Sequence, residues 1–123
     1  LRYFMFRYEE YLSKQRGMIF SQDQWDKIWM ASPSDSIEHI HAKSKAPEKH
    51  KHRLGNLVLL TPNLNSKLYD KPAKDKADTY AKTGVLVAAR VAEMIKDRGS
   101  WSKNEIDAWE EELIAWATTE WAN

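Results

Sequence analysis

Histidine, acid and amide side chains that could activate water and bind a metal ion gather in the middle of this 123-residue chain. They are Glu38, His39, His41, His50, His52, Asn56 and Asn65. A histidine whose pKa lies near its ordinary value of about 6.5 can act as a general base near neutral pH. A hard divalent cation such as Mg²⁺ takes oxygen ligands, usually only one or two of them from the protein. These residue types therefore meet the demands of metal-assisted phosphodiester hydrolysis.

The segments that carry these residues are predicted to form a strand, a loop, a second strand and a helix. Residues 36–40 (SIEHI) read as a short strand, and residues 42–54 as a polar, lysine-rich loop. The apolar run 56–61 (NLVLLT) is the strongest strand signal in the chain, and Pro62 favours a helix that begins there and carries Asn65. This order is the layout of a ββα-metal finger, in which tertiary structure brings the end of the first strand against the helix.

The rest of the chain is predicted to be helical. Amphipathic spacing, capping patterns and breakers predict helices over 1–16, 21–29, 72–82, 85–97 and from Ser102 onward. The last helix has an apolar stripe that we expect to be core, formed by Ile106, Trp109, Leu113 and Trp116. The predicted fold is mostly α with a small β-hairpin. We divide the single domain into flanking helices (1–30), a ββα core (36–70) and a helical C-terminal region (72–123).

The composition is that of an ordinary globular domain, with 42% hydrophobic and 30% charged residues. No apolar stretch is long enough to cross a membrane, and no signal peptide is present, so we expect a cytoplasmic protein with no membrane partner. The absence of cysteine excludes a disulfide framework and a cysteine-ligated zinc. Since a helical pattern begins at Leu1, we expect this chain to be the C-terminal part of a longer protein.

The net charge of +1 conceals an uneven distribution of charge. Between residues 43 and 82, ten lysines and arginines stand against four acids, whereas residues 99–123 hold one lysine and six acids. A basic middle suggests a face for a polyanion, and an acidic end suggests a face for solvent or a partner domain. The alternative is that the lysines only solvate exposed helices.

The motifs SIEHIHAKS and HRLGNLVLLTPNLNSKL resemble the HNH domain at the C-terminus of GmrSD-type modification-dependent restriction enzymes. That pattern consists of acid-His-Ile, a loop, Leu-Gly-Asn-Leu, an apolar strand and Leu-Asn-Ser. The aromatic N-terminal helix and the closing helix WSKNEIDAWEEELIAWATTEW are also similar, so the resemblance covers nearly the whole chain. The nine-residue interval from Asn56 to Asn65 also resembles the spacing in HNH domains of RNA-guided nucleases.

The resemblance implies roles for individual residues. His39 becomes the general base, and Glu38 and Asn65 become metal ligands, most simply for Mg²⁺, with Mn²⁺ as a substitute. Asn56 becomes the central Asn, which holds the loop and orients the histidine. His52 takes a supporting role. The basic residues expected to hold the DNA backbone without reading its sequence are Lys43, Lys45, Arg53 and Lys67.

The function implied by the resemblance is a metal-dependent DNA endonuclease, the effector of a restriction and phage-defence protein. An NTPase-like sensor domain is expected N-terminal to it in the same polypeptide. The alternative is a non-catalytic nucleic-acid-binding or inter-domain module on an HNH scaffold, although a decayed copy would be expected to have lost His39 or Asn65. A third possibility is a zinc ion held by the four histidines. The modification or sequence recognised, nicking versus double-strand cleavage and the oligomeric state stay open.

Two site residues carry open alternatives. Strand alternation places His41 on the same face as His39, where His41 is either a second phosphate contact or a solvated loop residue. His41 and Ala42 stand where many members of the family have an apolar residue and a proline. The same alternation points Glu38 away from His39, so its role as a ligand follows from the resemblance alone.

Overall fold

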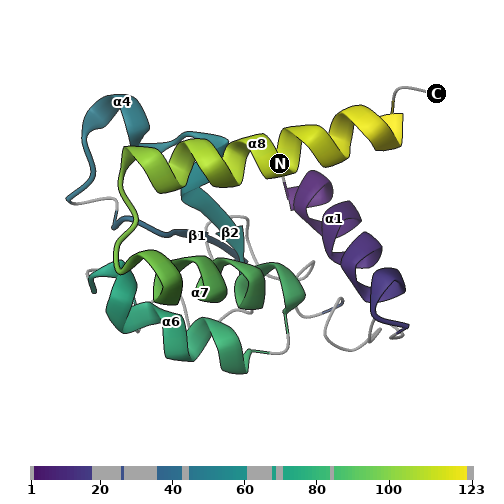
Figure 1. The fold of residues 1–123 in the computed structure, drawn as a ribbon, viewed down its shortest axis with the longest axis horizontal. Coiled ribbons are helices and arrows are strands. Elements are labelled where there is room, and N and C mark those ends of the chain that lie inside the picture. The colour runs from purple at the N-terminus through teal and green to yellow at the C-terminus, as the bar shows by residue number, and fades with distance from the viewer. Residues whose placement is uncertain are drawn as a thin grey trace.

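A two-stranded antiparallel sheet lies between helices that come from both ends of the chain (Figure 1). The structure is a computed structural model that describes residues 2–17, 26, 36–42, 45–60, 68, 71–83 and 85–121. Its elements, in chain order, are α1 (Arg2–Gln15), β1 (Ile37–His39), α4 (Glu48–Lys51), the 3₁₀ turn η1 (Leu54–Asn56), β2 (Leu57–Leu59), α6 (Ala73–Lys82), α7 (Leu86–Arg98) and α8 (Lys103–Trp121).

The register of the sheet places the strand residues opposite one another as Ile37 with Leu59, Glu38 with Val58, and His39 with Leu57. One backbone hydrogen bond continues the ladder at each end, from Ile40 N–H to the Asn56 carbonyl and from Leu60 N–H to the Ser36 carbonyl (both 2.9 Å). An isolated hairpin of this length is marginal in water, so its stability depends on what covers it.

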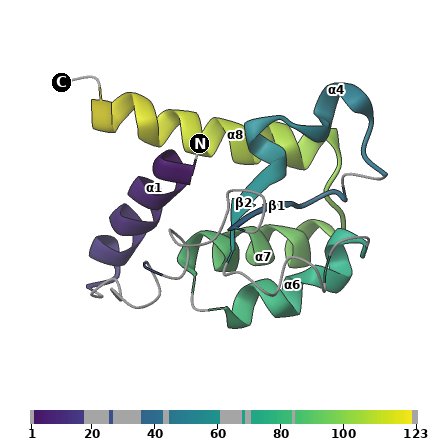
Figure 2. The same ribbon diagram turned by 180° about the vertical axis from the view of Figure 1, so that it is seen from behind.

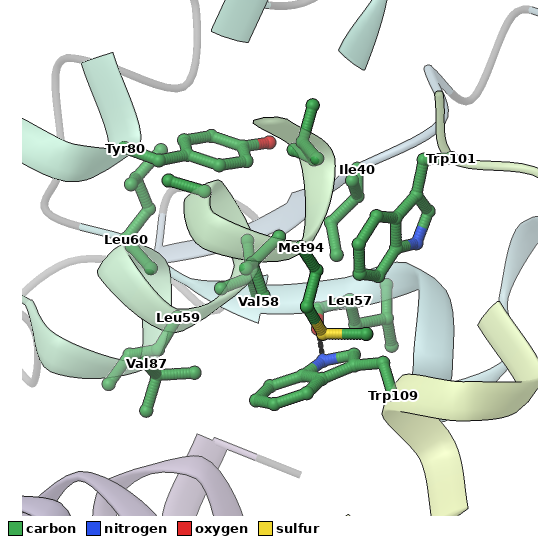
Figure 3. Packing of buried hydrophobic residues seen from close by; sticks show 14 of the residues in the cluster. Ile40, Leu57, Val58, Leu59, Leu60, Tyr80, Val87, Met94, Trp101 and Trp109 are labelled. Atoms are coloured by element: carbon green, nitrogen blue, oxygen red, sulfur yellow. Dashed lines mark hydrogen bonds between the residues drawn. The ribbon is translucent and has the colours of Figure 1, made fainter. Parts of the chain in front are cut away.

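The helices supply that cover on both sides of the sheet. Both views show α8 above the strand pair and α7 below it, with α6 lying below α7 (Figures 1 and 2). All three residues of β2 are buried, which explains why this strand is a continuous apolar run and not an alternating one. Trp109 of α8 packs under β2 and donates its indole N–H to the Leu57 carbonyl (3.4 Å), as Figure 3 shows.

The predicted stripe on α8 is core, since Ile106, Trp109, Leu113 and Trp116 are at most 8% exposed. Its far end meets the aromatic residues of α1, where the rings of Tyr8 and Trp116 lie 5.0 Å apart. These contacts join the first and last helices of the domain.

Long-range capping fixes where α7 begins. The Glu9 carboxylate of α1 accepts hydrogen bonds from the backbone N–H groups of Leu86 and Val87 (2.7 and 2.8 Å). These amides lie at a helix N-terminus, where no intrahelical acceptor exists. At the other end, Gly99 adopts φ +81°, a left-handed conformation that glycine adopts without a Cβ penalty.

The structure confirms the predicted fold class, mostly helical with a small antiparallel hairpin. The predicted loop 42–54 needs correction, because it contains the short helix α4 and the beginning of η1. The helices predicted over 21–29 and after Pro62 lie outside the described residues, apart from Asp26 and Leu68. None of the described helices is long and apolar enough to span a membrane.

Candidate active site

His39 stands at the end of β1, half-buried, with its side chain beside that of His52. His39 Nε2 lies 3.2 Å from His52 Nδ1, and the two rings meet edge to face. His52 is the exposed C-terminal cap residue of α4. One of the two facing nitrogens must carry the proton and the other must accept it. The two histidines therefore form a pair in which one proton is shared across the contact.

Asn56 holds the backbone of the loop that carries these histidines. Its side chain is fully buried, and its Oδ1 accepts the His41 backbone N–H (2.8 Å). Its Nδ2 donates to the carbonyls of His41 (3.1 Å) and Lys51 (3.0 Å). One amide thus joins the segment after His39 to the C-terminal turn of α4, just before His52. This is the loop-holding geometry expected of a central Asn.

The Glu38 carboxylate lies on the opposite side of β1 from this pair and is only 2% exposed. It accepts a hydrogen bond from the Tyr80 hydroxyl (2.9 Å) and lies 3.1 Å from Lys76 Nζ. Burial raises the pKa of Glu38, while the Lys76 charge and these hydrogen bonds act in the opposite direction. A cation would have to displace an ammonium group to reach this carboxylate. We therefore reassign Glu38 from metal ligand to partner of Lys76.

Lys76 of α6 is fully buried against the strand that carries His39. Its ammonium group donates to the carbonyls of His39 (2.8 Å) and Ile40 (3.2 Å) and pairs with Glu38. A lysine has three N–H donors, and these three acceptors match them in number. Lys76 thus holds the backbone of His39 and Ile40 in place through their carbonyl groups.

Sequence reasoning did not identify Lys76 and Tyr80 as site residues, although a signal was present. On α6 the buried residues Ala73, Lys76, Ala77 and Tyr80 follow the spacing i, i+3, i+4, i+7. That spacing marks the core face of a helix, so a lysine on it must have partners inside the protein. The partner acid, Glu38, could not be read from local sequence because it lies in another element.

Arg53 was expected to contact DNA, but its guanidinium group lies against α8. It forms ion pairs with Glu110 (2.5 Å) and Asp107 (2.8 Å), which raise its pKa. Glu110 also accepts the Gly55 N–H (3.2 Å), and the Trp101 indole donates to the Gly55 carbonyl (3.0 Å). These contacts dock the Leu-Gly-Asn turn on α8. We therefore reassign Arg53 from a phosphate contact to a fold contact.

His41 follows the end of β1, so strand alternation does not extend to it. Its half-buried side chain lines a cavity together with Lys45. Burial lowers the pKa of His41, and the charges of Lys76 and Lys45 lower it further. This environment favours a neutral imidazole and disfavours a cationic phosphate contact.

The remaining predicted site residues, Asn65, Lys43 and Lys67, lie outside the described residues. Within the described ranges, no three His, Cys, Asp or Glu side chains form a group that could hold a metal ion. All four histidines lie in those ranges, so the structure does not support a zinc ion held by them. The ligand set expected from the sequence is therefore reduced to Asn65.

Comparison with known protein families gives a match over most of the chain. The family model described as GmrSD restriction endonucleases, C-terminal domain, matches residues 1–116. No curated protein and no solved structure matches significantly. The match includes the hairpin, the histidine pair and all but the end of α8.

Proposed function

Because the chain belongs to the family of GmrSD restriction endonuclease C-terminal domains, we propose that it hydrolyses DNA phosphodiester bonds with His39 as general base. The observation that carries this proposal is the pairing of His39 with His52 at the end of β1. A hydrogen bond to one ring nitrogen of a histidine fixes the ring orientation and the tautomer, which a general base requires.

Each residue of the site has a distinct part in this proposal. His39 removes a proton from the attacking water, and His52 orients the ring and shares the proton. Asn56 and Lys76 are positioning residues, since their contacts are with backbone carbonyls and N–H groups and with Glu38. Lys45, an exposed lysine, is the described member of the proposed phosphate-binding set.

Dependence on Mg²⁺, or on Mn²⁺ in its place, stays a prediction. A bound cation would stabilise negative charge on the phosphate. Among the described residues, Glu38 does not fit as a ligand, because Lys76 occupies its carboxylate. We propose Asn65 as the ligand from the protein.

The wider role follows from the family. We propose that this domain is the effector of a restriction and phage-defence protein and that a sensor domain N-terminal to it licenses cleavage. A non-catalytic module that only binds DNA is the second candidate. The observation that favours the second candidate is the buried Glu38–Lys76 pair, which occupies the acid expected to bind metal.

A supercoiled-plasmid assay separates the two candidates. The chain is incubated with Mg²⁺ or Mn²⁺, with and without EDTA, beside His39→Ala and Asn65→Ala. His50→Ala is the matched control, because His50 lies outside the 3.2 Å histidine contact. We expect nicked or linear DNA from the parent and the control only, and loss of activity in EDTA. Activity that survives His39→Ala contradicts the mechanism, and DNA binding without any cleavage supports the second candidate.

A further inference from the structure

A cavity of about 270 Å³ is lined by the segment that follows β1, beginning at His41, two residues after His39. Three segments meet around it: the loop after β1 with His41 and Ala42, the start of α6, and the α7–α8 turn with Trp101. These segments converge at the same end of the molecule (Figure 1). The cavity is therefore built from parts of the chain that only the tertiary fold brings together.

The charged side chains that line this cavity, among the described residues, are lysines. Lys45, Lys71 and Lys74 are exposed at its edge, and none of the described residues in its lining is acidic. Burial lowers the pKa of His41, and the charges of Lys76 and Lys45 lower it further. A cavity mouth of this kind attracts an anion.

The interior of the cavity is apolar, with walls that include Ala42, Ala73 and the edge of the buried Trp101. A free phosphate would match the lysines but gains nothing from apolar walls. An apolar protein side chain would match the walls but not the lysines. A nucleotide has both parts, a flat ring and a phosphate. The volume falls below the roughly 300–1,000 Å³ of drug-sized sites, so it has room for one ring system and not for a duplex.

We propose that this cavity receives one unstacked base of the DNA strand, while the lysines hold the phosphates beside that base. Enzymes that extrude a base place it in a fitted pocket. This proposal rests on DNA being the substrate. Asn56 binds both backbone groups of His41, so the cavity wall and the segment after His39 form one rigid piece. A base held there sets which phosphate faces His39.

Base unstacking can be measured without cleavage. His39→Ala protein is mixed with duplex oligonucleotides that carry 2-aminopurine at one position each, because this base fluoresces more strongly when it leaves the stack. We expect the fluorescence to rise when 2-aminopurine stands at one position of the duplex and not at the others. Ala73→Leu fills the cavity and should remove the rise. Ala81→Leu, an exposed substitution on the same helix, should leave it unchanged.

Two lysine variants on α6 test whether the lysines at the cavity edge contact phosphates. Lys74→Ala should reduce the slope of log Kd against log salt by about one, as expected for one lost phosphate contact. Lys82→Ala, also exposed but outside the cavity lining, should leave the slope unchanged. Should Ala73→Leu fail to fold, Ser100→Leu places a leucine in the cavity lining from the turn between α7 and α8.

The outcomes separate this proposal from the proposed function. If the parent cleaves plasmid but the cavity-filling variants keep the fluorescence rise, the cavity proposal is overturned and the nuclease stands. If no preparation cleaves plasmid but the rise appears and depends on Ala73, the nuclease proposal fails and the cavity remains a base-binding site. If the protein binds the duplex but the 2-aminopurine fluorescence rises at no position, the cavity proposal is also overturned.

Discussion

Two histidines within hydrogen-bond distance behave as a pair, and this sets the chemistry of the site at the scale of single residues. His39 and His52 share one contact of 3.2 Å. One of the two facing nitrogens donates and the other accepts, so the tautomer of one ring sets the tautomer of the other. His41, nearby in sequence, has a different environment and a lowered pKa. The three histidines are therefore not interchangeable as bases.

The first prediction concerns His52. Replacing His52 with alanine removes one hydrogen bond and one orienting contact, which together are worth about 1 kcal/mol. We expect plasmid cleavage to slow by roughly fivefold to tenfold, whereas His39→Ala should abolish it. Initial rates beside the His50→Ala control measure the effect. If His52→Ala abolishes cleavage while His39→Ala retains it, His52 is the base and the assignment of His39 is wrong.

The second prediction concerns the pH response of His41. Its pKa is lowered in the folded state, so the folded chain binds this proton less tightly than the unfolded chain does. The resulting stability is fully present above the ordinary value of about 6.5 and is lost as the pH falls through the lowered pKa. An NMR titration should place the His41 midpoint below 6.5, and Lys45→Met should move it upward. A midpoint at or above 6.5 contradicts the geometry.

At the scale of elements, α6 and α8 hold the hairpin from two sides through polar contacts as well as packing. Lys76 of α6 binds the carbonyls of the segment that carries His39. Glu110 of α8 binds both Arg53 and the Gly55 N–H. Neither helix belongs to the strand-loop-strand-helix finger itself. The site therefore depends on the helical C-terminal region for its geometry.

The third prediction tests Lys76 as a positioning residue. Lys76→Met leaves the Glu38 carboxylate buried without its ammonium partner, which should cost about 3–5 kcal/mol. The double variant Glu38→Leu with Lys76→Met removes both charges and should recover much of this stability. It should not recover cleavage, because the carbonyls of His39 and Ile40 still lack their donor. Urea unfolding and initial rates are measured on both variants, and full activity in a folded double variant contradicts the positioning role.

At the scale of the whole molecule, α8 contacts both the candidate site and the N-terminal helix α1. Several of its acidic side chains form ion pairs within the protein. Asp107 and Glu110 pair with Arg53, Glu112 pairs with Arg90 of α7, and Glu120 pairs with Arg7 of α1. The acidic end of the sequence is thus partly neutralised by arginines from three other segments. Exposed pairs of this kind contribute little stability singly, so the main role of α8 is packing.

The fourth prediction concerns the close packing of α8 against Gly55 in the turn η1. A Cβ on Gly55 would lie only 2.0 Å from the Ile106 carbonyl oxygen, so Gly55→Ala forces α8 away from the turn. We expect a loss of about 3 kcal/mol or more in the free energy of unfolding. Gly99→Ala is the matched control, because its Cβ meets nothing within 4 Å and only backbone strain of about 1–2 kcal/mol applies. Equal losses in the two variants contradict this packing.

Much of this protein is determined by local sequence. The helices α1, α6, α7 and α8 lie close to their predicted ranges, because helical periodicity is a property of neighbouring residues. The short helix α4 was missed, because its four polar residues carry no apolar periodicity. The strands around His39 and Asn56 were predicted from short apolar runs between breakers.

Tertiary structure alone decided which polar groups meet. No sequence spacing could pair Glu38 with Lys76 and Tyr80, Arg53 with Glu110, or Gly55 with the backbone of α8. Each pairing depends on how helices pack across the hairpin, and packing angles are not encoded in any one segment. The physical reason is burial: a charge inside the protein must find a partner, and the partner comes from whichever element lies against it.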